Sequence, residues 1–353
     1  MKQMQTRIRD FGISIGSLPT GPLNKITDVA GVTVGHCTVK EGPHQTGVTV
    51  ILPSPKNPFS HKLPAASFVL NGFGKTQGLI QMDELGSLET PIALTNTLNV
   101  GLVHDALVEY MLNLCGRDHI PLFSVNPIVC ECNDSSLNQI ANRVITKEHV
   151  FSAIRSAEAD FEEGSVGAGR GTVCYGFKGG IGSSSRQIEL DGTTYTLGVL
   201  VQSNHGRSIH LTIDGKKAGT EILKKNPQAA FLSPTDRGSI IMIVATDLPV
   251  SDRQLRRIIK RAGVGLIRTG SYLGHGSGDI MIGFSTAYTL ADTQAPAIQM
   301  IPILNESKIE QAFLACAEAA EEAILNSLVT AESVTGTDGR TLHSLSEWLP
   351  TIL

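Results

Sequence analysis

A glycine–serine pair at residues 238–239 has the sequence context that a self-cleaving nucleophile requires. The polar segment that ends at Gly238 is typical of a turn, and Ser239 begins a nearly all-apolar run that predicts a buried strand. The Ser239 hydroxyl adjoins the preceding peptide bond, and Gly238 has no Cβ to crowd an attack on its carbonyl carbon. An N→O acyl shift followed by hydrolysis would make Ser239 a new chain terminus.

Such cleavage would place an α-amine on the residue that also carries the attacking hydroxyl. An α-amino group has an unperturbed pKa of about 7.7–8.0, so it can accept a proton near neutral pH. The alternative is that Gly238 and Ser239 simply enter a strand. Their spacing alone does not decide between the two interpretations.

A second candidate site is Gly74-Lys75-Thr76, which follows an apolar run as the end of a phosphate-binding P-loop does. A P-loop needs another glycine five residues before Gly74, and Val69 occupies that position. The motif is therefore incomplete, and a nucleotide-binding protein without peptidase activity stands as an alternative interpretation.

Other catalytic and metal-binding motifs are missing from the sequence. Neither G-x-S-x-G nor H-E-x-x-H occurs, so neither an α/β-hydrolase serine nor a zincin-type metal site is indicated. The six cysteines contain no C-x-x-C pair, and the closest two are Cys130 and Cys132. We expect buried free thiols and no metal site.

Composition excludes several classes of partner. The chain has 353 residues, of which 41% are hydrophobic and 18% charged, which suits a soluble globular protein. Its net charge is −4 and it has no basic block, so we expect no nucleic-acid partner. No apolar run approaches membrane-spanning length and no secretory signal is visible, so we expect no membrane partner and a cytoplasmic location.

The elements that must position these residues form a mixed pattern of strands and helices. With no internal repeat and no polar linker, this pattern indicates one layered α/β domain. Predicted strands cover residues 46–52, 67–70, 121–132, 193–202, 239–246 and 279–285. Predicted helices cover residues 102–114, 147–160 and 251–267, and a last one starts near 307; capping boxes open the last two, at Ser251–Gln254 and Ser307–Glu310.

Eight segments, in order along nearly the whole chain, resemble the DmpA family, which includes L-aminopeptidase/D-amidase-esterases and β-peptidyl aminopeptidases. The segments are ITDVAGVTVGH (26–36), TGVTVILP (46–53), NGFGK (71–75), ELGSLETPI (84–92), EGSVGAG (163–169), FKGGIG (177–182), GS (238–239) before its strand, and GHGSGD (274–279). A match of this extent is more specific than any single motif. It also accounts for Gly74-Lys75-Thr76 without a nucleotide.

The resemblance implies a four-layer αββα sandwich, two packed sheets covered by helices, as in DmpA and ornithine acetyltransferase proteins. It implies autocatalytic cleavage between Gly238 and Ser239, into an α chain of residues 1–238 and a β chain of residues 239–353. Ser239 would then be the nucleophile. The implied assembly is a homo-oligomer, a tetramer of αβ units.

The resemblance also implies roles for individual residues. Ser277 and Asp279 would lie beside the new α-amine, Ser277 to relay or hold its proton and Asp279 to orient it, although some members have Glu at that position. Asn204 would donate its amide N–H to the oxyanion of the tetrahedral intermediate. Glu131 would bind the free amino group of the substrate, which favours aminopeptidase over endopeptidase action.

The expected activity is therefore the release of N-terminal residues from small peptides, or from aminoacyl amides and esters, through an acyl-enzyme on Ser239. No metal or organic cofactor is expected. A linear-amide or pantetheine-type amide hydrolase with the same nucleophile is the closer alternative.

Overall fold

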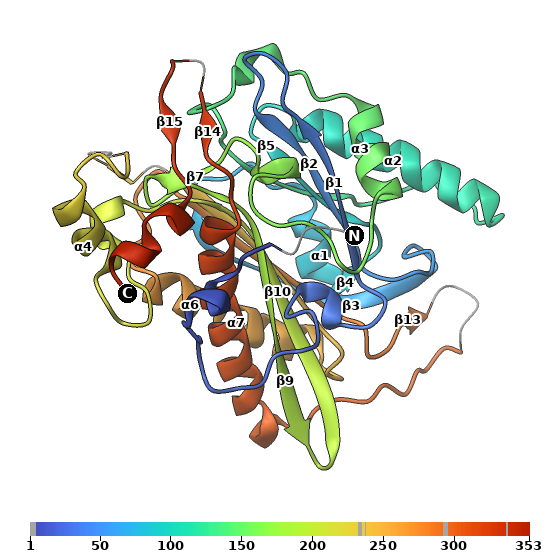
Figure 1. The fold of residues 1–353 in the computed structure, drawn as a ribbon. Helices are drawn as coiled ribbons and strands as arrows, with labels where there is room; N and C mark the ends of the chain where they lie inside the picture. Colours follow the sequence, from blue (N-terminus) through green and yellow to red (C-terminus); the bar gives the residue numbers. More distant parts are fainter. Residues whose placement is uncertain (1–4, 232–234, 237, 292–295, 337) are drawn as a thin grey trace.

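Two sheets packed face to face form the centre of the structure, a computed structural model that describes residues 5–231, 235–236, 238–291, 296–336 and 338–353 (Figure 1). Within these residues the larger sheet has seven strands. Their order is β13 (Leu290–Ala291), β3 (His61–Gly72), β12 (Gly278–Ser285), β11 (Ser239–Thr246), β10 (Thr193–Asn204) and β9 (Gly180–Leu190), with β4 (Ser87–Leu88) paired to β3. The order in the smaller sheet is β1 (Thr33–Val39), β2 (Thr46–Leu52), β5 (Ile92–Asn96) and β6 (Ile128–Cys132).

The apolar run after Ser239 is buried on both faces of the larger sheet, as predicted. Successive side chains of a strand point to opposite faces, and those of β11 fill two different cores. Three of them pack toward the smaller sheet: Ile241, Ile243 and Ala245. The other three pack toward a layer of helices: Ile240, Met242 and Val244.

Helices cover the outer face of each sheet. The helices α5 (Asp252–Ile259), α6 (Ala262–Arg268) and α7 (Glu310–Val329) pack on the larger sheet. On the smaller sheet lie α2 (Val100–Arg117) and α3 (Lys147–Arg155), on the opposite side of the molecule (Figure 1). The prediction of a four-layer αββα sandwich is confirmed. No helix among the described segments combines the length and apolar character needed to cross a bilayer.

Short elements connect these layers near the ends of the strands. They are the helices α1 (Leu79–Leu85) and α4 (Ala218–Lys225), and the hairpins β7 (Val173–Cys174) with β8 (Phe177–Lys178) and β14 (Val334–Thr335) with β15 (Thr341–Leu342). The hairpin of β7 and β8 follows a glycine-rich segment and ends next to β9.

Four element predictions differ from the structure. The strand predicted from residue 121 starts only at Ile128, and the helix from residue 147 ends at Arg155, after which Glu158 bridges to β1. The helix predicted over 251–267 is two helices, and two glycines, poor helix formers, follow the break. The capping box at Ser251 is present, but Asn305 caps the turn before α7, so the box predicted at Ser307 is wrong.

Candidate active site

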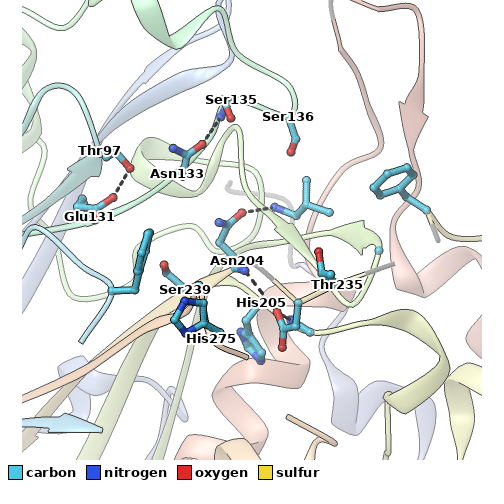
Figure 2. Close-up of a pocket in the computed structure, with 18 of the residues that line it drawn as sticks. Thr97, Glu131, Asn133, Ser135, Ser136, Asn204, His205, Thr235, Ser239 and His275 are labelled. Atoms are coloured by element: carbon cyan, nitrogen blue, oxygen red, sulfur yellow. Dashed lines mark hydrogen bonds between the residues drawn. The ribbon is translucent and has the colours of Figure 1, made fainter. Parts of the chain in front are cut away.

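A cavity of about 760 Å³ opens where β6, β10 and β11 end or begin at one edge of the two sheets (Figure 2). Ser239, Asn204 and Glu131 all line it, although they come from three different strands. The fold therefore brings together three of the residues that the sequence singled out. Ser277 and Asp279 do not line the cavity; they lie behind it, next to the residue that pairs with Ser239.

Ser239 is the first residue of β11 and is 6% exposed. It pairs with Asn204 on β10 and with Gly278 on β12, and its Oγ accepts a hydrogen bond of 3.1 Å from the Gly278 N–H. This bond fixes the side chain at the floor of the cavity. Because Ser239 Oγ is the acceptor in this bond, its own hydroxyl proton is not engaged by Gly278. A base in the cavity could therefore remove that proton.

Gly238 lies in close contact with the end of β10. A Cβ at this position would be 1.9 Å from the Asn204 carbonyl oxygen and 2.4 Å from the Cα of His205. Only glycine allows the chain to enter β11 so close to Asn204. The absence of a side chain at residue 238 thus serves the approach of two strands as well as access to its carbonyl carbon.

A hydrogen bond to the oxygen end of its amide fixes the Asn204 side chain. Its Oδ1 accepts a hydrogen bond of 2.9 Å from the Val173 N–H on β7. The Nδ2 end is therefore the end available to a group in the cavity. Because Asn204 and Ser239 are directly opposite each other in the ladder, that donor adjoins the nucleophilic oxygen (Figure 2).

Ser277 and Asp279 form a buried pair. The Ser277 hydroxyl donates a hydrogen bond of 2.6 Å to Asp279 Oδ1, while Asp279 Oδ2 has no hydrogen-bond partner within the described part of the chain. Burial raises the pKa of Asp279 to about 6, although the bond from Ser277 opposes this; the charge of Asp236 adds to the rise. Alternation along β12 places this carboxyl on the helix-facing side of the sheet, so it flanks the Ser239 backbone and not its hydroxyl.

Glu131 lies on β6 and is 3% exposed. One carboxylate oxygen accepts a hydrogen bond of 3.1 Å from the Lys75 backbone N–H, and the other accepts one from the Thr97 hydroxyl (Figure 2). Among the described residues no ion pair involves this carboxylate. A buried charge of this kind is costly unless a cation partner arrives, and a substrate ammonium would be such a partner.

Two titratable residues of the cavity were not singled out from the sequence, Asp236 and His205, and Lys75 was singled out only as part of a nucleotide-binding motif. Burial lowers the pKa of His205 to about 4, against the effect of the nearby Asp236 charge, so its imidazole is neutral at pH 7. Lys75 belongs to the incomplete P-loop motif, but its backbone N–H is bound to Glu131. Asp236 lies in the polar segment before Gly238. A charged residue in such a segment is expected to be exposed, so the sequence did not indicate that it is buried.

All six cysteines are free, and burial raises the pKa of the Cys130 thiol to about 12. The described residues contain no group of three or more His, Cys, Asp or Glu side chains placed to hold a metal ion.

Comparisons with known proteins agree with this architecture. Residues 24–342 match the model of Peptidase family S58. The chain is 38% identical to the beta-peptidyl aminopeptidase BapA of Sphingosinicella xenopeptidilytica over 359 residues, which cover 96% of this chain and 88% of that protein. Its structure is similar to that of the PH0078 protein from Pyrococcus horikoshii OT3, with 47% identity and a TM-score of 0.91 over 98% of each chain.

The structure is also similar to that of the L-aminopeptidase D-Ala-esterase/amidase from Ochrobactrum anthropi. The two chains share 33% identity and a TM-score of 0.91 over 98% of each. That protein is described as a prototype for the serine aminopeptidases and a variant of the Ntn hydrolase fold.

Proposed function

Because the chain belongs to Peptidase family S58, we propose that it is a serine aminopeptidase and amidase whose nucleophile, Ser239, is released by cleavage of its own Gly238–Ser239 bond. The observation that carries this proposal is the cavity itself. A serine at the start of a strand, an amide donor on the neighbouring strand and a buried carboxylate with no ion pair to a described residue line one cavity. The products of cleavage would be an α chain of residues 1–238 and a β chain of residues 239–353 that remain packed in one domain.

Self-cleavage begins with the addition of Ser239 Oγ to the Gly238 carbonyl carbon. The C–N bond then breaks and the hydroxyl proton passes to the departing nitrogen, which leaves an ester and a free α-amine on Ser239. Water next adds to the ester carbon, releases Gly238 as a carboxylic acid and restores the hydroxyl. The reaction consumes one water and needs no other reagent.

Turnover of substrate then uses the new amine as the base. The amine takes the Ser239 hydroxyl proton while Oγ attacks the substrate carbonyl, and the Asn204 Nδ2–H stabilises the oxyanion that forms. The leaving amine receives the proton, and water hydrolyses the acyl-enzyme. Asp279, held by Ser277, keeps the amine oriented from the far side of β12.

Glu131 selects substrates that have a free amino group. Its carboxylate lines the same cavity as Ser239, so a bound ammonium would place the adjoining carbonyl of an N-terminal residue near Oγ. An internal peptide bond offers no such ammonium. We therefore propose small peptides and aminoacyl amides or esters as substrates.

The nucleotide-binding alternative is not favoured. Gly74-Lys75-Thr76 lies in the connection between β3 and α1, and the Lys75 N–H that a phosphate would need is bound to Glu131. A linear-amide or pantetheine-type substrate would lack a free amine beside the carbonyl, which is the group that we propose Glu131 to bind.

We further propose a cytoplasmic, homo-oligomeric protein. Six unpaired cysteines suit a reducing compartment. Light scattering of the purified protein tests the assembly: a mass equal to one chain would refute it.

A substrate panel tests the activity. The protein, after incubation to allow cleavage, is assayed with L-, D- and β-aminoacyl p-nitroanilides and with their N-acetylated forms. We expect hydrolysis of at least one free-amine series and at least a hundredfold slower hydrolysis of its acetylated form. Ser239→Ala should abolish activity, whereas the exposed Ser307→Ala should keep it; activity in Ser239→Ala would refute the proposal.

A further inference from the structure

The carboxylate of Asp236 connects the two segments that must meet for self-cleavage. Its Oδ1 accepts a hydrogen bond of 3.0 Å from the Gly206 N–H and one of 3.3 Å from the Gly238 N–H. Gly206 follows the end of β10, which carries Asn204, and Gly238 supplies the carbonyl of the scissile bond. One side chain therefore binds the segment that follows the oxyanion-donor strand and the residue whose carbonyl carbon is to be attacked.

Asp236 is also held in place from its other side. The residue is 6% exposed, and a Cβ on Gly274 would be only 2.4 Å from the Asp236 carbonyl oxygen. The Gly274 carbonyl in turn accepts hydrogen bonds from Asn71 and from the Ser277 N–H. The carboxylate thus lies between the loop before β12 and the end of β10, where its position is determined by packing.

The second carboxylate oxygen of Asp236 is buried and has no hydrogen-bond partner among the residues that the structure describes. Buried polar atoms without a partner are few in native structures, and each calls for a structural or functional reason. The charge of Asp236 also adds to the rise in the pKa of Asp279. Both described hydrogen bonds of the carboxylate thus converge on its other oxygen, Oδ1.

Self-cleavage of the intact chain needs an accurately positioned scissile carbonyl more than turnover by the cleaved enzyme does. Before cleavage the Ser239 nitrogen belongs to an amide and cannot act as a base, so the first reaction depends more heavily on the position of the scissile carbonyl. Charge-assisted hydrogen bonds are the strongest and most directional means of fixing a backbone N–H.

We propose that Asp236 is a positioning residue for self-cleavage, which orients the Gly238 peptide against Ser239 and Asn204 through its bonds to the Gly238 and Gly206 N–H groups. This inference rests on the proposed function. After cleavage, Gly238 bears a carboxylate two residues from Asp236. The two like charges repel, so the hydrogen bond from the Gly238 N–H to Asp236 is weakened after cleavage.

The test compares two rates in the same variants. Self-cleavage is followed by intact mass from freshly purified single chains, and turnover is measured per cleaved molecule with a free-amine p-nitroanilide. We expect Asp236→Ala to slow self-cleavage at least tenfold more than it slows turnover. Asp236→Asn keeps an acceptor oxygen but loses the charge, so its self-cleavage rate should lie between those of Asp236→Ala and the unsubstituted chain.

Asp105→Ala, which removes an exposed carboxylate on α2, is the matched control and should leave both rates as they are. Circular dichroism and a thermal melt show whether each variant is folded. If Asp236→Ala does not fold, the two rates are compared in Asp236→Asn instead. Equal losses in both rates, or self-cleavage at the unsubstituted rate in both Asp236 variants, would overturn the inference. If the unsubstituted chain never cleaves, the proposed function fails as well.

Discussion

The buried carboxyl of Asp279 makes a quantitative prediction about stability and pH. Burial raises its pKa from 3.8 to about 6 in the uncleaved chain. Between these values the unfolded chain has lost the proton while the folded chain keeps it. Folding is therefore destabilised as the pH rises through this window, by up to about 3 kcal/mol once both forms are ionised, since one pH unit corresponds to about 1.4 kcal/mol.

The perturbation is Asp279→Asn in a Ser239→Ala background, which keeps the chain uncleaved. An amide does not titrate, so the variant lacks this pH-dependent loss. Between pH 4 and pH 7.5 the difference in unfolding free energy between the two proteins should change by about 2.4 kcal/mol in favour of the Asp279→Asn variant, because the unfolded carboxyl is already partly ionised at pH 4. Constant effects of the substitution, such as a weaker bond from Ser277, cancel in this comparison.

Urea unfolding at several pH values, followed by tryptophan fluorescence and circular dichroism, measures the difference. The exposed Asp105→Asn in the same background serves as control and should give a curve parallel to that of its parent. If the Asp279→Asn variant also ran parallel to its parent from pH 4 to pH 7.5, Asp279 would not be the desolvated carboxyl that we describe. Its role beside the amine would then lose its physical basis.

Three further predictions concern the cavity itself. In cleaved protein, Asn204→Ala should lower kcat for an L-aminoacyl p-nitroanilide a hundred- to a thousandfold with little change in KM, because it removes the oxyanion donor; an unchanged kcat would exclude Asn204 from that role. Glu131→Gln should raise KM for free-amine substrates about ten- to a hundredfold and leave N-acetylated ones unaffected, since a bond to a charged group is worth about 1.5–3 kcal/mol; equal effects on both would contradict the assignment. Gly238→Ala should prevent self-cleavage, seen as one band on a denaturing gel, because its Cβ would lie 1.9 Å from the Asn204 carbonyl oxygen; normal cleavage would show that the two segments are not so closely packed.

The strand that carries the nucleophile could be predicted from the sequence. An uninterrupted apolar run of six residues (240–245) after a polar turn has few other interpretations, and β11 spans Ser239–Thr246 as expected. The strand β9 could not be predicted, because its first half is glycine and serine except for Ile181. Its conformation depends on tertiary contact: a Cβ on Gly182 would lie 2.1 Å from the Ala323 carbonyl oxygen of α7.

In the candidate site, too, some features could be predicted from the sequence and others only from the structure. Resemblance identified Asn204 and Glu131, but only the register of β10 with β11 shows that Asn204 lies opposite Ser239. That Ser277 and Asp279 lie behind the cavity follows from the alternation of β12, which no local pattern reveals. Asp236 was overlooked because both of its hydrogen-bond donors are backbone groups, one of them from a segment thirty residues away in the chain.

The central claim is that one residue supplies both the attacking hydroxyl and the base, once its amine is free. The most direct measurement is a time course in which intact mass and p-nitroanilide hydrolysis are followed in the same sample of single-chain protein. The account predicts that hydrolysis rises in proportion to the fraction cleaved, with Ser239 as the new N-terminus and one water added to the summed mass of the two chains. Full hydrolytic activity while residues 238 and 239 are still joined would contradict it.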